Sequence, residues 1–500
     1  MIRTIDSYLL NGIQAELCRV EVDVSVSSRP CTTIVGLPDS AVRESIERVR
    51  TAIVNCGYVF PLGRITINLA PADRRKEGPV YDLPIALALL AASGVLSTEG
   101  RQASLDCLAA GELALDGSLR PVRGIVGLGL LARRLKRRDV IVPEDNAAEI
   151  ALVDGVRALP AGSLGQVISH LNKIEILSSF SPLQEKRVRP TRPSVEFNEI
   201  KGQEGPKRAL IVAAAGWHHL FLLGPPGCGK TLMARALPGL LPRLERDAYL
   251  ELLQIESCAG MSVNHRSAAR ERPVRCPHHT ASAPAIVGGG SHPKPGEASL
   301  AHHGVLFLDE LPEFDRRVLE TLRQPLEEHA VTIARVKGTL RFPARFLLVA
   351  AANPSRSSHG PAREHGYLSR LSRPLMDRID LQVEVQPVPV RRLREGRDDG
   401  MSTGTAKHMV ESAITIQQQR QGAIPNSMLS GDQLDKHAGM TDEASKFLDA
   451  TAEELGLSAR GWNAIRRIAR TTADLAARER IELQDVVESV GYRKLDTGMP

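Results

Sequence analysis

The segment GPPGCGKT, residues 224–231, constrains the fold more than any other stretch of this chain. It matches GxxxxGK[ST] at every fixed position, follows the apolar run HLFLL and precedes LMARAL, whose pattern is typical of a helix. A strand, a glycine-rich loop and a helix in this order place backbone N–H groups around phosphate oxygens. The sequence therefore predicts an α/β domain that binds ATP and Mg²⁺.

Two residues of this segment have an expected chemical task. Lys230 would reach the β- and γ-phosphates, and Thr231 would help to hold Mg²⁺. The other loop residues are expected to surround the nucleotide: Gly224, Pro225, Pro226, Gly227, Cys228 and Gly229. The cysteine could make the site sensitive to oxidation, but a tolerated small residue is the favoured interpretation.

Composition adds only broad limits. The chain has 500 residues, 42% apolar and 24% charged, which is typical of folded globular proteins with several domains. No signal-peptide pattern is seen, and the longest apolar stretch, residues 85–96, is too short to span a bilayer. The seven scattered cysteines form no CxxC pair, which argues against disulfides and structural zinc. We therefore expect a cytoplasmic protein without a membrane segment.

Two polar tracts divide the chain. Residues 181–194 are rich in proline and basic residues, so they are predicted to be an exposed linker. Residues 391–408 form a second polar connector. These tracts separate an N-terminal domain (1–180), an ATPase core (195–390) and a C-terminal region (409–500) with helical periodicity.

Carboxylates follow a second apolar strand, GVLFLDE, residues 304–310. Asp309 would coordinate Mg²⁺, and Glu310 would orient the water that attacks the γ-phosphate. Taken alone, the pair could be a solvated strand end, but the phosphate loop upstream favours catalysis. A third strand, RFLLVAAANP, ends at Asn353, whose amide could hydrogen-bond both the water and the γ-phosphate.

Two arginines stand at the starts of other predicted elements. Arg378 precedes a strand in SRPLMDRIDLQVEV, and Arg460 opens a helix in LSARGWNAIRR. Their spacing alone does not make them catalytic, because an arginine in such a position is more often a surface ion-pair partner.

The order of these motifs resembles that of AAA+ ATPases of the magnesium-chelatase-like branch, and specifically the ComM/YifB family. The segments 272–314 and 318–346 resemble that family's signatures, and the resemblance covers nearly the whole chain. It implies that Asn353 is the first sensor, Arg378 an arginine finger acting on a neighbouring subunit, and Arg460 the second sensor on a helical lid. An arginine finger in trans implies a closed ring, and the family expectation is a homo-hexamer.

The N-terminal part resembles the Lon-protease-type domain, an α/β module with the ribosomal S5 domain 2-like fold. The resemblance lies in ESIERVRTAIVNCGYVFPLGRITINLAPADRRKEGPVYDLPIALALL. A Lon-type site needs a serine nucleophile and a lysine base. Val80 and Tyr81 stand where the serine is expected, and Arg120 and Arg123 where the lysine is expected. The domain is therefore predicted to be non-proteolytic.

Three functions remain open for the ATP energy. The first is a DNA motor, a helicase that drives branch migration in recombination or natural transformation, as the resemblance implies. The second is a magnesium-chelatase motor subunit, and the third is a remodeller of proteins. The Lon-like domain argues against the second, because chelatase motor subunits in general lack it, but it does not separate the first from the third.

One local feature favours DNA. Residues 331–345, VTIARVKGTLRFPAR, predict a β-hairpin that carries Arg335, Lys337, Arg341 and Arg345. Copies around a ring would form a cationic collar for phosphates, independent of DNA sequence. The alternative is that these charges only keep an edge hairpin soluble. The glycine- and histidine-rich segment 272–303 is the other candidate for a pore element.

Five histidines lie within residues 278–303 and could suggest zinc. Their spacing matches no standard ligand pattern, so hydrogen bonds within loops are the favoured role. Many ComM-like relatives carry a cysteine cluster after the sensor asparagine, whereas this chain reads NPSRSSHG. What orders residues 355–366 cannot be predicted, and neither can the preferred DNA structure, polarity or loader.

Overall fold

The computed structural model describes residues 2–27, 29–180, 195–261, 270–290, 293–335, 338–354, 370–389 and 400–493. The predicted linker 181–194 lies outside these residues. The contacts divide the chain into two compact units. The first is Met1–Val188 with Arg246–Ala268, and the second is Arg189–Glu245 with Ala269–Pro500.

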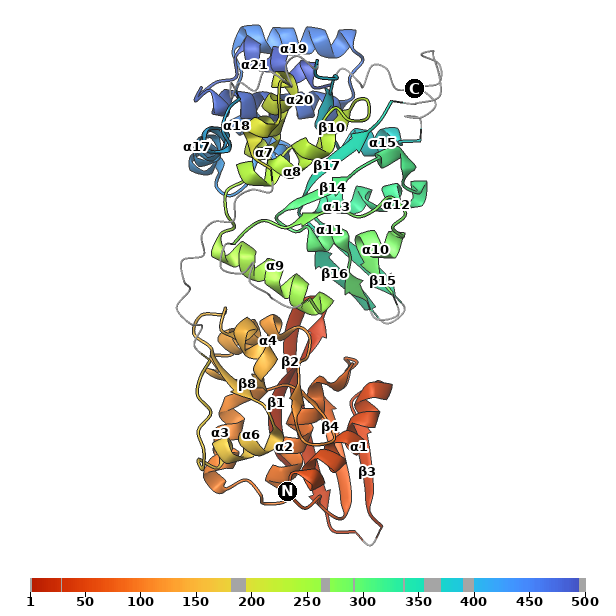
Figure 1. The fold of residues 1–500 in the computed structure, drawn as a ribbon, viewed down its shortest axis with the longest axis vertical. Coiled ribbons are helices and arrows are strands. Elements are labelled where there is room, and N and C mark those ends of the chain that lie inside the picture. Colours follow the sequence, from red (N-terminus) through yellow and green to blue (C-terminus); the bar gives the residue numbers. More distant parts are fainter. Residues whose placement is uncertain are drawn as a thin grey trace. The chain divides into compact units, whose positions relative to one another are not determined.

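A seven-stranded mixed sheet forms the centre of the first unit, in the order β3-β4-β2-β1-β5-β8-β9 (Figure 1). Strand β2 pairs antiparallel with β1 and β4, and the other pairs are parallel. The strands are β1 (Arg3–Asn11), β2 (Gln14–Ser25), β3 (Cys31–Val35), β4 (Arg64–Ala70), β5 (Cys107–Ala109), β8 (Asp139–Pro143) and β9 (Arg157–Ala161), with a small hairpin of β6 (Glu112–Leu113) and β7 (Leu119–Arg120).

The longest apolar stretch of the sequence forms a core helix of this unit. Helix α2 (Asp82–Ala92) is buried on every side, which explains a segment that is apolar without periodicity. No helix among the described residues has the length and hydropathy needed to cross a membrane. The other helices are α1 (Ser40–Asn55), α3 (Thr98–Asp106), α4 (Ile125–Arg134), α5 (Glu144–Ile150) and α6 (Leu164–Leu171).

Helix α9 (Arg246–Ala259) belongs to the first unit, although the sequence analysis placed it inside the core 195–390. Its buried leucines pack toward α4. The main-chain N–H of Gly124 donates to the carbonyl of Ser257 over 3.1 Å, and the Ser257 hydroxyl donates to the buried Glu149 carboxylate over 2.6 Å. The chain therefore passes from the second unit to the first before α9 and returns to the second unit after it.

The second unit is built on a five-stranded parallel sheet in the order β11-β14-β17-β10-β18 (Figure 1). Successive residues of a strand point to opposite faces, so Leu220 and Leu222 join one core and Phe221 the other. Because both faces are covered, the three central strands β14, β17 and β10 are apolar throughout. The strands are β10 (Leu220–Leu223), β11 (Val274–Arg275), β14 (Val305–Leu308), β17 (Leu347–Ala352) and β18 (Leu381–Glu384).

Helices and hairpins complete this module. The predicted hairpin forms from β15 (Ala330–Arg335) and β16 (Gly338–Pro343), paired antiparallel. A smaller hairpin joins β12 (Gly288–Gly289) and β13 (Lys294–Pro295). The helices are α7 (Glu204–Gly216), α8 (Lys230–Leu240), α10 (Ala283–Val287), α11 (Glu297–Leu300), α12 (Arg316–Thr321), α13 (Arg323–Glu328) and α15 (Arg373–Met376).

The C-terminal region is helical, as its periodicity predicted, and α17 and α20 pack on α7 (Figure 1). It begins at Thr403, inside the tract 391–408 that was expected to be a connector, because Ser402 caps the first helix. The helices are α17 (Thr403–Gln421), α18 (Asp432–His437), α19 (Asp442–Glu454), α20 (Ala459–Leu475) and α21 (Leu483–Gly491).

Candidate nucleotide site

The phosphate loop lies between β10 and α8, as predicted. Gly227 and Gly229 have φ angles of 79° and 96°, a backbone region that favours glycine. At Gly224 a Cβ atom would press on the main-chain carbonyl of Val385, so this position has no room for a side chain. Helix α8 starts at Lys230, which places its N-terminus, with favourable dipole, at the loop.

The Lys230 side chain is buried and lies across the loop. Its ammonium donates to the carbonyls of Gly224 over 2.6 Å and Pro225 over 2.9 Å, and to Asn353 Oδ1 over 2.9 Å. These acceptors are uncharged, so the positive charge is not neutralised by a carboxylate through them. Such an ammonium is suited to bind phosphate.

Thr231, in the first turn of α8, contacts Asp309, which directly follows β14. The Thr231 hydroxyl donates to Asp309 Oδ2 over 3.0 Å, and the other carboxylate oxygen accepts from the main-chain N–H of Glu310 over 3.0 Å. Mg²⁺ prefers oxygen ligands and usually takes only one or two carboxylates from the protein. A hydroxyl and a carboxylate held together beside a phosphate loop therefore fit an Mg²⁺–nucleotide site.

Glu310 follows β14 with a left-handed backbone, φ 52° and ψ 47°. Non-glycine residues in this conformation are uncommon, and they concentrate at functional sites. Its carboxylate is half-exposed: Oε1 lies 3.5 Å from Asn353 Nδ2, and Oε2 lies 3.8 Å from His279 Nδ1. Asn353 thus contacts both Lys230 and Glu310, and it joins the phosphate side of the site to the carboxylate side.

The two predicted arginines lie together, at a different place. In the described structure, Arg378 and Arg460 both form ion pairs with Glu327 of α13 rather than with the side chains of the phosphate loop. The Arg378 side chain is only 8% exposed, whereas the Glu327 side chain is 45% exposed. Glu327 could not be predicted from the sequence, because its two arginine partners are 51 and 133 positions away.

The basic hairpin is present, but the structure describes the side chains of only some of its basic residues. Arg341 is exposed on β16, opposite Thr332. Arg335 pairs with Gly338 through its backbone, while its side chain and Lys337 lie outside the described residues.

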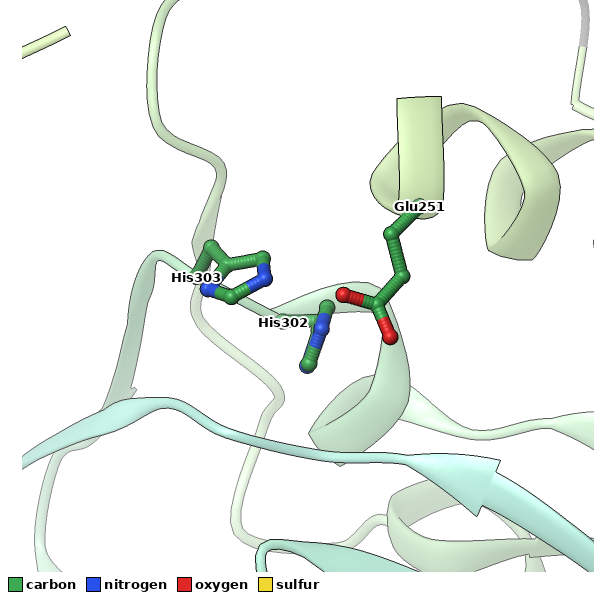
Figure 2. A group of neighbouring side chains, drawn as sticks. All are labelled: Glu251, His302 and His303. Carbon is green, nitrogen blue, oxygen red and sulfur yellow. The ribbon is translucent and has the colours of Figure 1, made fainter. Parts of the chain in front are cut away.

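The histidines form loop hydrogen bonds. His302 Nδ1 accepts from the main-chain N–H of Arg345 over 2.9 Å, and the carbonyl of His303 accepts from Arg272 over 2.7 Å. Figure 2 shows these two neighbouring rings, whose centroids are 3.9 Å apart. Glu251, also drawn there, belongs to α9 and therefore to the first unit. His292 lies outside the described residues.

Comparison with known proteins identifies the family. Competence protein ComM of Haemophilus influenzae is 41% identical over 97% of this chain and 96% of its own. The uncharacterized protein YifB of Escherichia coli has the same identity and coverage. This chain belongs to the ComM/YifB family. Similarity to the magnesium-chelatase 38 kDa subunit of Rhodobacter capsulatus is lower, 27% over 39% of this chain and 57% of that protein.

Family models relate this ComM/YifB chain to magnesium chelatases. They match residues 20–146 (subunit ChlI of Mg-chelatase), 196–393 (magnesium chelatase, subunit ChlI) and 400–493 (subunit ChlI, C-terminal). The parallel sheet and the helical C-terminal region fit a magnesium-chelatase-like AAA+ fold. Members of this ATPase family use ATP and Mg²⁺.

Proposed function

We propose that this protein is a ring-forming, ATP-driven DNA motor that moves branch points during recombination or the uptake of transforming DNA. The observation that carries the proposal is the assembled phosphate site, where Lys230, the Thr231–Asp309 pair and Glu310 meet at one edge of a parallel sheet. The name of the relative in Haemophilus influenzae, a competence protein, supports DNA as the load.

In this proposal each residue of the site has one task. Lys230 binds the β- and γ-phosphates, and Glu310 orients and polarises the attacking water. Asn353 contacts both of these side chains, so it can report the state of the γ-phosphate to the core. Thr231 and Asp309 would hold Mg²⁺, which neutralises phosphate charge when it is bound with the nucleotide.

The ring is proposed to be a homo-hexamer in which subunits share ATP sites. Arg378 would act as an arginine finger on the neighbouring subunit's ATP, and Arg460 as the second sensor. Contacts of this head-to-tail kind close into rings when the rotation between subunits allows it.

DNA would contact the hairpin of β15 and β16. The exposed guanidinium of Arg341 supports this, with Arg335 and Lys337 as further candidates. Contacts through such groups are made to phosphates, so they read no base sequence and weaken as salt rises.

The N-terminal domain, residues 1–180, is proposed to be a Lon-like module without protease activity. In place of a serine nucleophile the chain has Val80 and Tyr81, and the Tyr81 side chain is buried in the core of this unit. The parallel and antiparallel pairs of its sheet are compatible with an α/β module of this kind.

ATP hydrolysis with and without DNA tests the proposal. Wild type is compared at two salt concentrations without DNA and with single strands, duplex or a four-way junction, beside Lys230→Ala and Arg341→Ala. We expect DNA to stimulate hydrolysis, salt to weaken the stimulation, and Arg341→Ala to lose stimulation while keeping its DNA-free rate. Lys446→Ala, an exposed change on α19, is the matched control.

Two outcomes would redirect the proposal. Hydrolysis that is equal with every DNA would favour a chelatase-type or protein-remodelling load. Hydrolysis by Lys230→Ala at the wild-type rate would contradict the assigned ATP site itself.

A further inference from the structure

The carboxylate of Glu327 joins two distant parts of the second unit. Its Oε1 atom accepts from Arg460 Nη2 over 2.9 Å and also from Arg378 Nη2. Arg378 lies between α15 and β18 of the ATPase core, whereas Arg460 is in the first turn of α20. One side chain therefore holds an arginine of the core and an arginine of the C-terminal helices.

Arg378 depends on this carboxylate. Its side chain is 8% exposed, its Nη1 donates to the carbonyl of Pro374, and its Nε is buried without a hydrogen-bond partner in the described structure. Burial lowers the pKa of the Arg378 guanidinium, and the charge of Glu327 acts against this effect. A buried charge that loses its partner is strongly destabilised, so Glu327 determines where this group can stay.

A second carboxylate fastens the same face of α20. Asp380, two residues after Arg378, lies 3.5 Å from Arg467 Nη2 and 2.9 Å from His218 Nδ1. The other ring nitrogen of His218 lies 2.8 Å from the Thr471 hydroxyl. Residues 460, 467 and 471 are seven and four positions apart, so they share one helix face. This face of α20 therefore contacts the core through Glu327, Asp380 and His218.

We propose that Glu327 is the positioning residue that holds Arg378 and Arg460 as one unit for the ATP of the neighbouring subunit. Because Glu327 accepts one N–H group from each guanidinium, it fixes their mutual orientation. Arg460, which is 49% exposed, keeps N–H groups at the surface. The inference rests on the proposed function, in which Arg378 acts in trans, and it extends this role to Arg460, the second sensor. It adds that the two arginines act together. Because Arg460 belongs to α20, a movement of α20 would change the position of Arg378 through Glu327.

The first test is a charge-neutral substitution. Glu327→Gln keeps the shape of the side chain but removes its negative charge, so position 327 no longer forms an ion pair with either guanidinium. We expect kcat for ATP to fall at least about tenfold with little change in KM, because arginine fingers contribute 10³–10⁵ to such rates. The thermal midpoint should also fall, because Arg378 loses its charged partner. In an Arg378→Ala, Arg460→Ala background the same substitution should add no further loss. Glu328→Gln is the matched control, since its neighbouring exposed carboxylate bonds to Gln324 instead.

The second test separates positioning in trans from a role within one subunit. Glu327→Gln subunits keep an intact phosphate loop, and Lys230→Ala subunits keep an intact arginine pair. Mixing the two should restore hydrolysis, as mixing Arg378→Ala with Lys230→Ala should. Restoration by Arg378→Ala but not by Glu327→Gln would overturn the inference and leave the proposed function standing. Restoration by neither would remove the trans finger and the inference with it.

Wild-type kcat in Glu327→Gln, or a rate above wild type, would also contradict positioning. If Glu327→Gln does not fold, Arg460→Gln tests the same claim from the exposed side of the pair. It should lower kcat without changing ATP binding, and its effect should vanish when Arg378 is also replaced.

Discussion

Glu310 adopts the backbone conformation that is least expected for its residue type among the predicted catalytic positions. The left-handed turn after β14 lets the Asp309 carboxylate accept the Glu310 N–H while the Glu310 side chain lies toward Asn353. The two adjacent carboxylates can then have different tasks: Asp309 would coordinate Mg²⁺, and Glu310 would orient the attacking water.

Glu310→Gln should bind ATP with nearly wild-type affinity and hydrolyse it at least about a hundredfold more slowly, because general bases contribute about 10²–10⁴ to rates. Nucleotide-binding titration and steady-state hydrolysis measure the two quantities separately. Glu313→Gln, close by in the sequence, is the control. Normal turnover in a folded Glu310→Gln protein would remove Glu310 from catalysis.

His219 should make stability depend on pH. Burial lowers its pKa to about 4, and its Nδ1 accepts from the main-chain N–H of Leu348 over 3.1 Å, so the folded ring is neutral. The unfolded ring takes up a proton below about pH 6.5. Stability is therefore complete above that pH and falls as pH drops toward about 4, by up to about 1.4 kcal/mol per pH unit.

Thermal unfolding of His219→Asn at several pH values tests this. Asparagine can accept the same hydrogen bond but does not titrate, so the midpoint should depend less on pH between 4 and 6.5. Equal pH dependence in wild type and variant would contradict the assignment to His219.

Residues of the site differ in how far the sequence could predict them. Lys230 and Thr231 belong to one contiguous motif whose backbone conformation is local, so their positions follow from the sequence. Asp309 and Asn353 follow strands, and parallel strands bring their ends to one edge. Glu327 could not be predicted, because its partners depend on how α13 and α20 pack in three dimensions.

At the scale of helices and strands, the apolar periodicity predicted which elements form, but it did not always predict which core they pack on. The strands β10, β14 and β17 and the hairpin of β15 and β16 appear where the sequence predicts them. Helix α9 has an apolar pattern that fits either core. Only its tertiary contacts, such as the bond from Ser257 to Glu149, assign it to the first unit.

The docking of α9 predicts the effect of a single hydroxyl. Ser257→Ala removes a hydrogen bond to the buried Glu149 carboxylate, which should cost about 1–3 kcal/mol. Amides of α9 should then exchange with deuterium about tenfold faster or more, as measured by mass spectrometry. Ser40→Ala, an exposed change in α1, should leave this exchange unchanged. Unaltered exchange in Ser257→Ala would show that α9 does not depend on this bond.

Gly224 of the phosphate loop and Gly205 of α7 form a matched pair of glycines. Gly224→Ala should lower both thermal stability and ATP affinity, because the new Cβ would collide with the Val385 carbonyl. Gly205→Ala meets no atom within 4 Å and lies in α7, where alanine is favoured by roughly 0.5–1 kcal/mol. Melting curves with and without ATP compare the two. Equal behaviour would contradict the tight approach of loop and strand end.

At the scale of the whole molecule, the sequence already indicates an ATPase with a helical C-terminal region, and the family confirms this. The division into units could not be foreseen, because the chain crosses between them again at Arg246 and Ala268. The motor function adds a ring and a DNA load to the ATP site, and both stay proposals that rest on Arg378 and the basic hairpin.

The most direct test of the motor is the dissociation of a labelled four-way DNA junction, followed on a native gel. The proposal predicts that wild type converts the junction to duplex arms with ATP and Mg²⁺, and that Glu310→Gln binds the junction without converting it. Wild type that hydrolyses ATP but leaves every junction intact, at low and high protein concentration, would contradict the DNA motor.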